Sequence, residues 1–103
     1  IRVQEAESGI FIPNIIRPGS GHGNGLLAIH APAGVREVLR LQIFDRWGDL
    51  LFSREHFAAD GATGWDGSAR GRAVLPGVYV YVIELELEDG ARVVKRGDVT
   101  VLR

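Results

Sequence analysis

The last third of the sequence constrains the fold most, because it is typical of one long β-hairpin. Val78 to Ile83 are all β-branched or aromatic, and a second segment of similar character ends the chain at Arg103. Such residues favour strands. Between the two segments lies Asp89-Gly90, a pair that favours a tight hairpin turn. Strand side chains alternate between two faces, so the length of this turn decides which residues are buried.

The rest of the chain repeats a pattern of short apolar segments separated by glycine and proline. Residues 38–44 alternate, which predicts a half-buried strand with Leu39, Leu41 and Ile43 on its apolar face. Further strands are expected at 9–13, 26–30 and 50–52. Glycine-rich segments predict loops at 17–25 and 56–71. No segment has the spacing of a long amphipathic helix, although 54–58 is compatible with a single helical turn.

These features predict an all-β fold, an immunoglobulin-like antiparallel β-sandwich of about seven strands. Residues 1–8 are polar and aperiodic, which is typical of a linker from an upstream passenger. Residues 9–103 are expected to form one domain around one core.

Composition excludes several classes of site. The sequence has no cysteine, so it has neither a disulfide framework nor a thiol nucleophile. Its three histidines lack a metal-ligand spacing, and a net charge of −1 gives no overall attraction to nucleic acid. No cofactor, metal or nucleic-acid partner is therefore expected. The longest apolar run, Val78 to Ile83, is far shorter than the roughly 20 residues of a membrane-spanning helix.

Pro76-Gly77-Val78-Tyr79 is similar to the start of a strand that carries a tyrosine corner. In that motif a tyrosine hydroxyl hydrogen-bonds to a backbone group a few residues upstream. Tyr79 would take this place, and Tyr81 would stand where antibody domains carry a cysteine.

Two tryptophan motifs each have a structural and a functional interpretation. In Trp65-Asp66-Gly67, we expect an Asx turn that places Trp65 over the core, rather than a sugar-stacking site. In Trp47-Gly48, we expect a hairpin-turn aromatic packed across the sheet, with a partner-contact anchor as the alternative.

The candidate catalytic groups do not form a recognised motif. Ser53, His56 and Asp60 could make a triad on paper, but no nucleophile elbow accompanies them. The acidic set Glu84, Glu86, Glu88 and Asp89 has strand spacing, and Arg92, Lys95 and Arg96 across the hairpin would balance it. We therefore expect no enzymatic activity.

Taken in order, five short motifs resemble one known family. They are Ile12-Pro13-Asn14, 43–48, Trp65-Asp66-Gly67, Pro76-Gly77-Val78-Tyr79 and 99–103. The set is similar to the type B sorting domains of the type IX secretion system, found at the C-terminus of gliding-motility-associated proteins of Bacteroidota. The family's glycine loop carries aspartates where this chain has Gly21 and Gly25, so no calcium site is expected.

The resemblance implies a C-terminal sorting domain that a type IX translocon and an outer-membrane partner barrel recognise. Its passenger would be secreted or held at the cell surface, in association with the outer membrane. Two alternatives remain open: an immunoglobulin-like adhesion module that binds carbohydrate or protein, and a structural module of an extracellular assembly.

The hydrophobic pattern predicts the register of the terminal hairpin. A three-residue loop, 88–90, would place Val99 opposite Tyr79 and Val93 opposite Leu85, all facing inward. An apolar stripe of Val78, Val80 and Val82 would then face outward as a partner-docking surface. The terminal strand adds further candidates for partner binding, since edge strands offer unpaired backbone groups: Val99, Val101 and Arg103.

Overall fold

The computed structural model describes residues 10–19, 25–31 and 34–102, and within these ranges the chain forms strands and no helix. The all-β prediction is therefore confirmed. The nine strands are β1 (Ile15–Ile16), β2 (Leu27–His30), β3 (Val35–Phe44), β4 (Leu50–Phe57), β5 (Asp60–Trp65), β6 (Ser68–Ala69), β7 (Arg72–Ala73), β8 (Gly77–Leu87) and β9 (Arg92–Val101).

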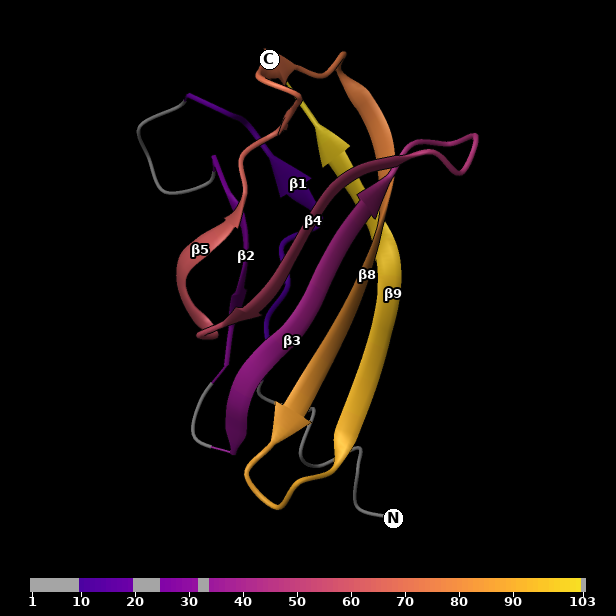
Figure 1. The fold of residues 1–103 in the computed structure, drawn as a ribbon. Helices are drawn as coiled ribbons and strands as arrows, with labels where there is room; N and C mark the ends of the chain where they lie inside the picture. Colours follow the sequence, from indigo (N-terminus) through magenta and orange to yellow (C-terminus); the bar gives the residue numbers. More distant parts are fainter. Residues whose placement is uncertain (1–9, 20–24, 32–33, 103) are drawn as a thin grey trace.

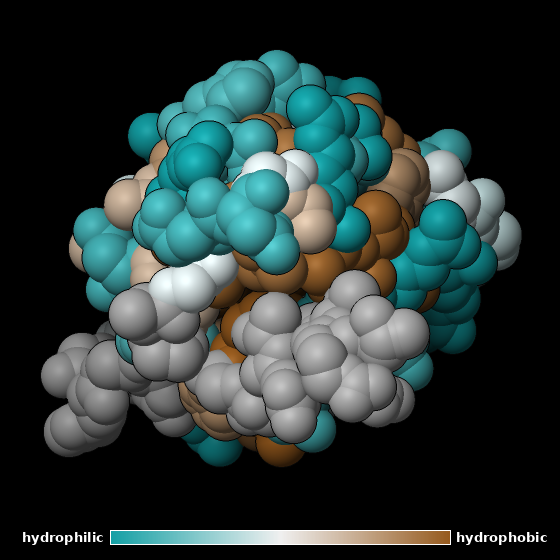
Figure 2. Space-filling view, turned by 90° about the horizontal axis from the view of Figure 1, so that it is seen from below, coloured by the Kyte–Doolittle hydropathy of each residue, from teal (hydrophilic) through white to brown (hydrophobic). Residues whose placement is uncertain are grey.

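The strands form two layers, as in a sandwich, with the core between them (Figure 1). One layer is a five-stranded sheet in the order β1-β9-β8-β3-β4, and β2 with β5 forms the other. The β6–β7 hairpin is a separate small ribbon. The sheet is mixed rather than wholly antiparallel, because β1 runs parallel to β9. At the end opposite the C-terminus, hydrophobic surface shows between hydrophilic surfaces (Figure 2).

The β8–β9 hairpin has the register that the hydrophobic pattern predicts. Leu87 and Ala91 close the turn through a backbone hydrogen bond of 2.8 Å, leaving a three-residue loop. Gly90 in this loop has a φ of 90°, which favours glycine. Tyr79 pairs with Val99, and this pairing fixes the parity of the whole hairpin.

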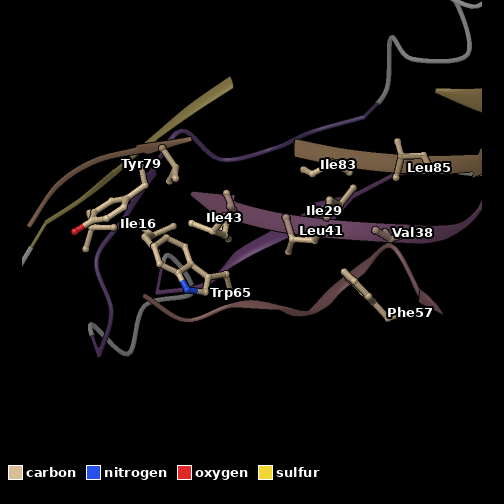
Figure 3. Packing of buried hydrophobic residues seen from close by; sticks show 13 residues of the cluster. Ile16, Ile29, Val38, Leu41, Ile43, Phe57, Trp65, Tyr79, Ile83 and Leu85 are labelled. Atoms are coloured by element: carbon tan, nitrogen blue, oxygen red, sulfur yellow. The ribbon is translucent and has the colours of Figure 1, made fainter. Parts of the chain in front are cut away.

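The largest fully buried side chain in the core is Trp65, which lies beside Tyr79, Ile16 and Ile43 (Figure 3). The Trp65 and Tyr79 rings meet edge to face with centroids 5.7 Å apart. The indole Nε1 of Trp65 donates a hydrogen bond to the Ser68 carbonyl at 2.8 Å. Burial of the large indole is thus combined with a partner for its one donor.

Tyr79 forms the predicted tyrosine corner. Its hydroxyl donates a hydrogen bond of 2.5 Å to the Leu75 carbonyl, four residues upstream. The bond ties the start of β8 to the bend that precedes it. Tyr81 lies two residues further along and is half-buried over Gly97, where a Cβ atom would stand 2.5 Å from the Tyr81 hydroxyl.

The first expected strand, 9–13, is not a strand in its described part. Phe11 makes only an isolated bridge to His30, and β1 begins beyond Pro13. Proline has no N–H to continue a ladder. The chain therefore leaves β2 at this point and joins β9 instead, which links the two layers.

Leu39 is not in the core, although the alternation of 38–44 placed it there. The register of β3 against β8 shifts between Val38 and Arg40, so Leu39 is an extra residue in the ladder. Such a bulge reverses the parity on its N-terminal side. Val38, which pairs with Leu85, is fully buried in its stead.

The segment 56–71 contains strands where its glycines predicted a loop. β4 continues to Phe57, so the helical turn at 54–58 is absent, and β5 follows at once. Gly64 allows β5 to approach β2 closely, because a Cβ there would overlap the Leu27 carbonyl. The glycine provides clearance between strands here rather than flexibility.

The outer face of the five-stranded sheet carries the expected charge balance in part. Arg92 lies 3.8 Å from Glu84 across the hairpin, and Arg40 of β3 lies 3.1 Å from the same carboxylate. On the neighbouring strands, His56 Nδ1 lies 2.8 Å from a Glu37 carboxylate oxygen. This contact raises the pKa of the exposed His56 imidazole, through its hydrogen bond and then its charge attraction to Glu37.

Replacement of the tyrosine-corner hydroxyl, Tyr79→Phe, should lower the free energy of unfolding by about 1 kcal/mol, because the Leu75 carbonyl loses its hydrogen bond. Urea titration followed by tryptophan fluorescence measures the loss. Tyr81→Phe is the matched control: among the described residues, its hydroxyl has no hydrogen bond, so stability should change little. Equal effects of both variants would contradict the assignment.

The Glu37–His56 pair predicts a titration above the ordinary imidazole value of 6.5. The stabilisation from this pair is present below the ordinary pKa and is lost as pH rises through the raised one. An NMR titration of the His56 ring protons measures the pKa, and Glu37→Gln should bring it back toward 6.5. An unchanged pKa in the variant would exclude Glu37 as the cause.

Candidate partner-contact surfaces

The outer face of β8 carries the predicted valine stripe. Val78 is 47% exposed, and Val80 and Val82 are half-buried. The strand register extends this stripe, because Phe44 of β3 pairs with Val80 and also with Leu50 of β4. We call this set the outer apolar patch: Phe44, Leu50, Val78, Val80 and Val82.

Phe44 and Leu50 were missed from the sequence, although the signal was present. Phe44 lies two residues beyond Gln42 and so shares its outward parity. The pairing of β3 with β4 is what brings Leu50, which is 46% exposed, to the same place.

Two of the expected contact residues on β9 are not on the surface. Val99 and Val101 are both fully buried, because the same parity that exposes Val78 turns them inward. Their side chains belong to the core, and their backbone groups face β8, because those of Thr100 and Leu102 face β1. Neither residue therefore offers the free edge groups on which its assignment to partner contact rested. Arg103 lies outside the described residues.

The free edge of β9 offers backbone groups instead. At its end, the Thr100 and Leu102 amides each donate a 2.9 Å hydrogen bond, to the Asn14 and Ile16 carbonyls respectively. Alternate residues of a strand direct their N–H and C=O groups to the same side. The same edge therefore continues through Asp98, Arg96 and Val94, and within the described ranges no strand pairs with it there.

The β3–β4 turn projects beyond the sheet, at the same end as the C-terminus (Figure 1). Asp45 Oδ1 accepts hydrogen bonds of 2.9 Å from the Trp47 and Asp49 amides, and Gly48 adopts a φ of 89°. Trp47 itself is 79% exposed, so the expectation that it packs across the sheet is wrong. Its ring lies against the Arg46 guanidinium instead.

A hollow of about 320 Å³ separates this turn from the bend before β8. Its lining includes the buried Tyr79 and Leu75, which is 79% exposed. Four further lining residues are aliphatic: Leu51, Val74, Pro76 and Val78. Neighbours on this surface therefore include two large exposed apolar side chains, Trp47 and Leu75.

The Trp65-Asp66-Gly67 motif has the structural role that we expected. Trp65 is fully buried, which excludes it as a stacking platform for sugars. Asp66 Oδ1 accepts hydrogen bonds from the Ser68 amide at 3.1 Å and from its hydroxyl at 2.6 Å. Gly67 has a φ of 83°, as this Asx turn requires.

The groups considered for catalysis make other contacts. His56 bonds to Glu37, and Asp60 Oδ1 accepts a hydrogen bond from the Ala62 amide. In the described ranges no cluster of three His, Asp or Glu side chains is suited to a metal ion.

Burial raises the pKa of the Tyr81 phenol; the charge of Lys95 opposes this shift and that of Asp98 reinforces it. Most of the glycine loop, 20–24, lies outside the described residues.

No membrane-crossing helix exists in the part of the chain that the structure describes.

The fold of this chain is similar to that of a solved structure. The crystal structure of CopC from Methylosinus trichosporium OB3b has a TM-score of 0.53 and 20% sequence identity, covering 88% of this chain and 84% of that one. The chain has no significant match among curated proteins.

The family model described as the CHU_C type IX secretion signal domain matches residues 10–101. The match includes all nine strands. Such a signal implies interaction with the type IX secretion machinery and export to the cell surface or the medium. The chain belongs to the CHU_C family of type IX secretion signal domains.

Proposed function

We propose that the domain directs a passenger protein through the type IX translocon and then attaches it to, or releases it from, the cell surface. The proposal rests on the family match over residues 10–101. We further propose that an outer-membrane partner barrel recognises the domain. In this proposal residues 1–8 are the linker from the passenger, and 9–103 are the sorting domain. The domain performs no catalysis itself.

Two neighbouring surfaces support a docking mechanism. The outer apolar patch exposes valine and leucine side chains, which gain free energy when a partner covers them. The β9 edge at Val94, Arg96 and Asp98 presents backbone groups that a partner strand could pair with. Val80 and Val82 of the patch pair with Asp98 and Arg96 of this edge, so one partner could contact both surfaces.

The outer apolar patch predicts that Val80→Glu blocks docking. A reporter with the full chain fused behind it should be exported by a type IX host and retained in a translocon mutant. With Val80→Glu, the exported amount should fall roughly tenfold or more, the equivalent of about 1.4 kcal/mol of docking free energy. Immunoblots of medium and surface fractions measure export.

Ser53→Glu is the matched control, since it adds the same charge to the exposed edge strand β4 without removing an apolar side chain. Circular dichroism of both purified variants checks that each is folded. Normal export of a folded Val80→Glu variant would exclude the patch. Export of the unaltered fusion in the translocon mutant would contradict the proposed function itself.

If a partner strand pairs with the β9 edge, export should depend on the backbone N–H groups of that edge as well as on the outer apolar patch. The Arg96 amide points away from β8 and bonds to none of the described residues, so Arg96→Pro removes this donor and no β8–β9 hydrogen bond. Arg96→Ala removes the side chain and keeps the donor. If a partner strand pairs with this edge, export should fall several-fold with proline and stay unchanged with alanine. A loss with alanine alone would assign the contact to the side chain instead.

A further inference from the structure

We infer that the hollow between the Trp47 turn and the Leu75 bend binds a segment of a partner polypeptide that carries an apolar side chain next to a carboxylate. The hollow would take the apolar side chain, and Arg46 would pair with the carboxylate. Val78 lines the hollow and is also a member of the outer apolar patch, so the two surfaces are continuous.

The lining of the hollow favours an apolar side chain over a sugar. Its exposed lining is mostly apolar and includes Tyr79. Two of the polar groups there already have partners: the Leu75 carbonyl accepts from Tyr79, and Asp45 Oδ1 accepts from two backbone amides. A sugar needs several hydrogen-bonding groups, whereas an apolar side chain needs only the surface that is present.

Arg46 supplies the charge complementarity. Its guanidinium lies over the Trp47 ring, 5.4 Å from the centroid, and within the described residues no carboxylate lies within ion-pair distance of it. A Cβ atom on Gly77 would stand 4.0 Å from its Nη2, which places this cation at the rim of the hollow. Stacking on Trp47 orients the planar group, and a carboxylate is the partner that its geometry fits best.

Both walls are held in place before any partner binds. Asp45 fixes the backbone of the Trp47 turn through two hydrogen bonds, and the tyrosine corner fixes the Leu75 bend. A site that needs no rearrangement loses less conformational entropy on binding. Exposed tryptophan and arginine are, moreover, the residue types that contribute most to protein interfaces.

The test uses the full chain, labelled with ¹⁵N and with ¹³C at methyl groups, and three blocked dipeptides as probes. Acetyl-Phe-Asp-amide should cause saturable shifts of the Trp47 indole and the Val78 methyl signals. Acetyl-Phe-Asn-amide should bind about two- to fivefold more weakly, as expected for an exposed ion pair. Acetyl-Ala-Asp-amide should cause no saturable shift, because it lacks the side chain that fills the hollow.

Arg46→Gln should give the Asp and Asn peptides equal affinity, and Leu75→Ser should weaken both peptides alike. Arg72→Gln, at another exposed arginine, is the matched control and should change neither. The inference is overturned if no peptide gives saturable shifts, or if wild type binds the Asp and Asn peptides equally. It is also overturned if maltose, galacturonate or anionic vesicles perturb Trp47 and the peptides do not. Dilution-dependent shifts without peptide would assign the hollow to a second copy of the chain. None of these outcomes depends on export.

Discussion

The three-residue turn between β8 and β9 fixes the side-chain parity on which the rest of the structure depends. One residue fewer would turn Val99 and Val101 outward and bring Asp98 into the core. With the observed register, the buried face of the hairpin meets the second layer, and β3 pairs against it in a compatible register. The same parity leaves Val78 exposed on the other face. The buried core and the outer apolar patch are thus two consequences of one turn.

The tyrosine corner connects this core to the surface at the C-terminal end. The Tyr79 ring packs against Trp65 inside, while its hydroxyl holds the Leu75 bend outside. The bend is one wall of the hollow, and the Trp47 turn is the other. The buried Trp65–Tyr79 pair is thus connected through one hydrogen bond to a wall of the hollow at the surface.

The ion pairs and the outer apolar patch occupy different parts of the outer face of the sheet. Around Glu84, arginines from β3 and β9 neutralise the carboxylate, and Glu37 holds His56 nearby. The outer apolar patch lies at the other end of the same strands, where no such ion pairs are found among the described residues. Arg46, beside that end, differs from the paired arginines because its one described contact is with an aromatic ring. A partner that approaches this end therefore meets apolar surface, the Arg46 cation, and the exposed Arg96 and Asp98 beside Val82 and Val80.

Sequence alone determined the local features of the fold. Alternation, turn chemistry and the spacing of Tyr79 predicted an all-β chain, the loop at 88–90 and the tyrosine corner, because each depends on residues that are close in sequence. It also predicted the family, through the order of short motifs. The sequence did not predict the bulge at Leu39, because an extra residue in one strand is defined only by its pairing with the neighbouring strand.

Only the tertiary structure decided which segments meet. The two tryptophans sit in similar Gly-containing turns, yet Trp65 is fully buried and Trp47 is 79% exposed. The difference arises because Trp65, in the β2–β5 layer, packs against the five-stranded sheet, whereas the Trp47 turn projects beyond that sheet. The parallel pairing of β1 with β9, and the meeting of the Trp47 turn with the Leu75 bend, join residues far apart in sequence. Periodicity describes one strand at a time, and the packing of whole layers selects these contacts.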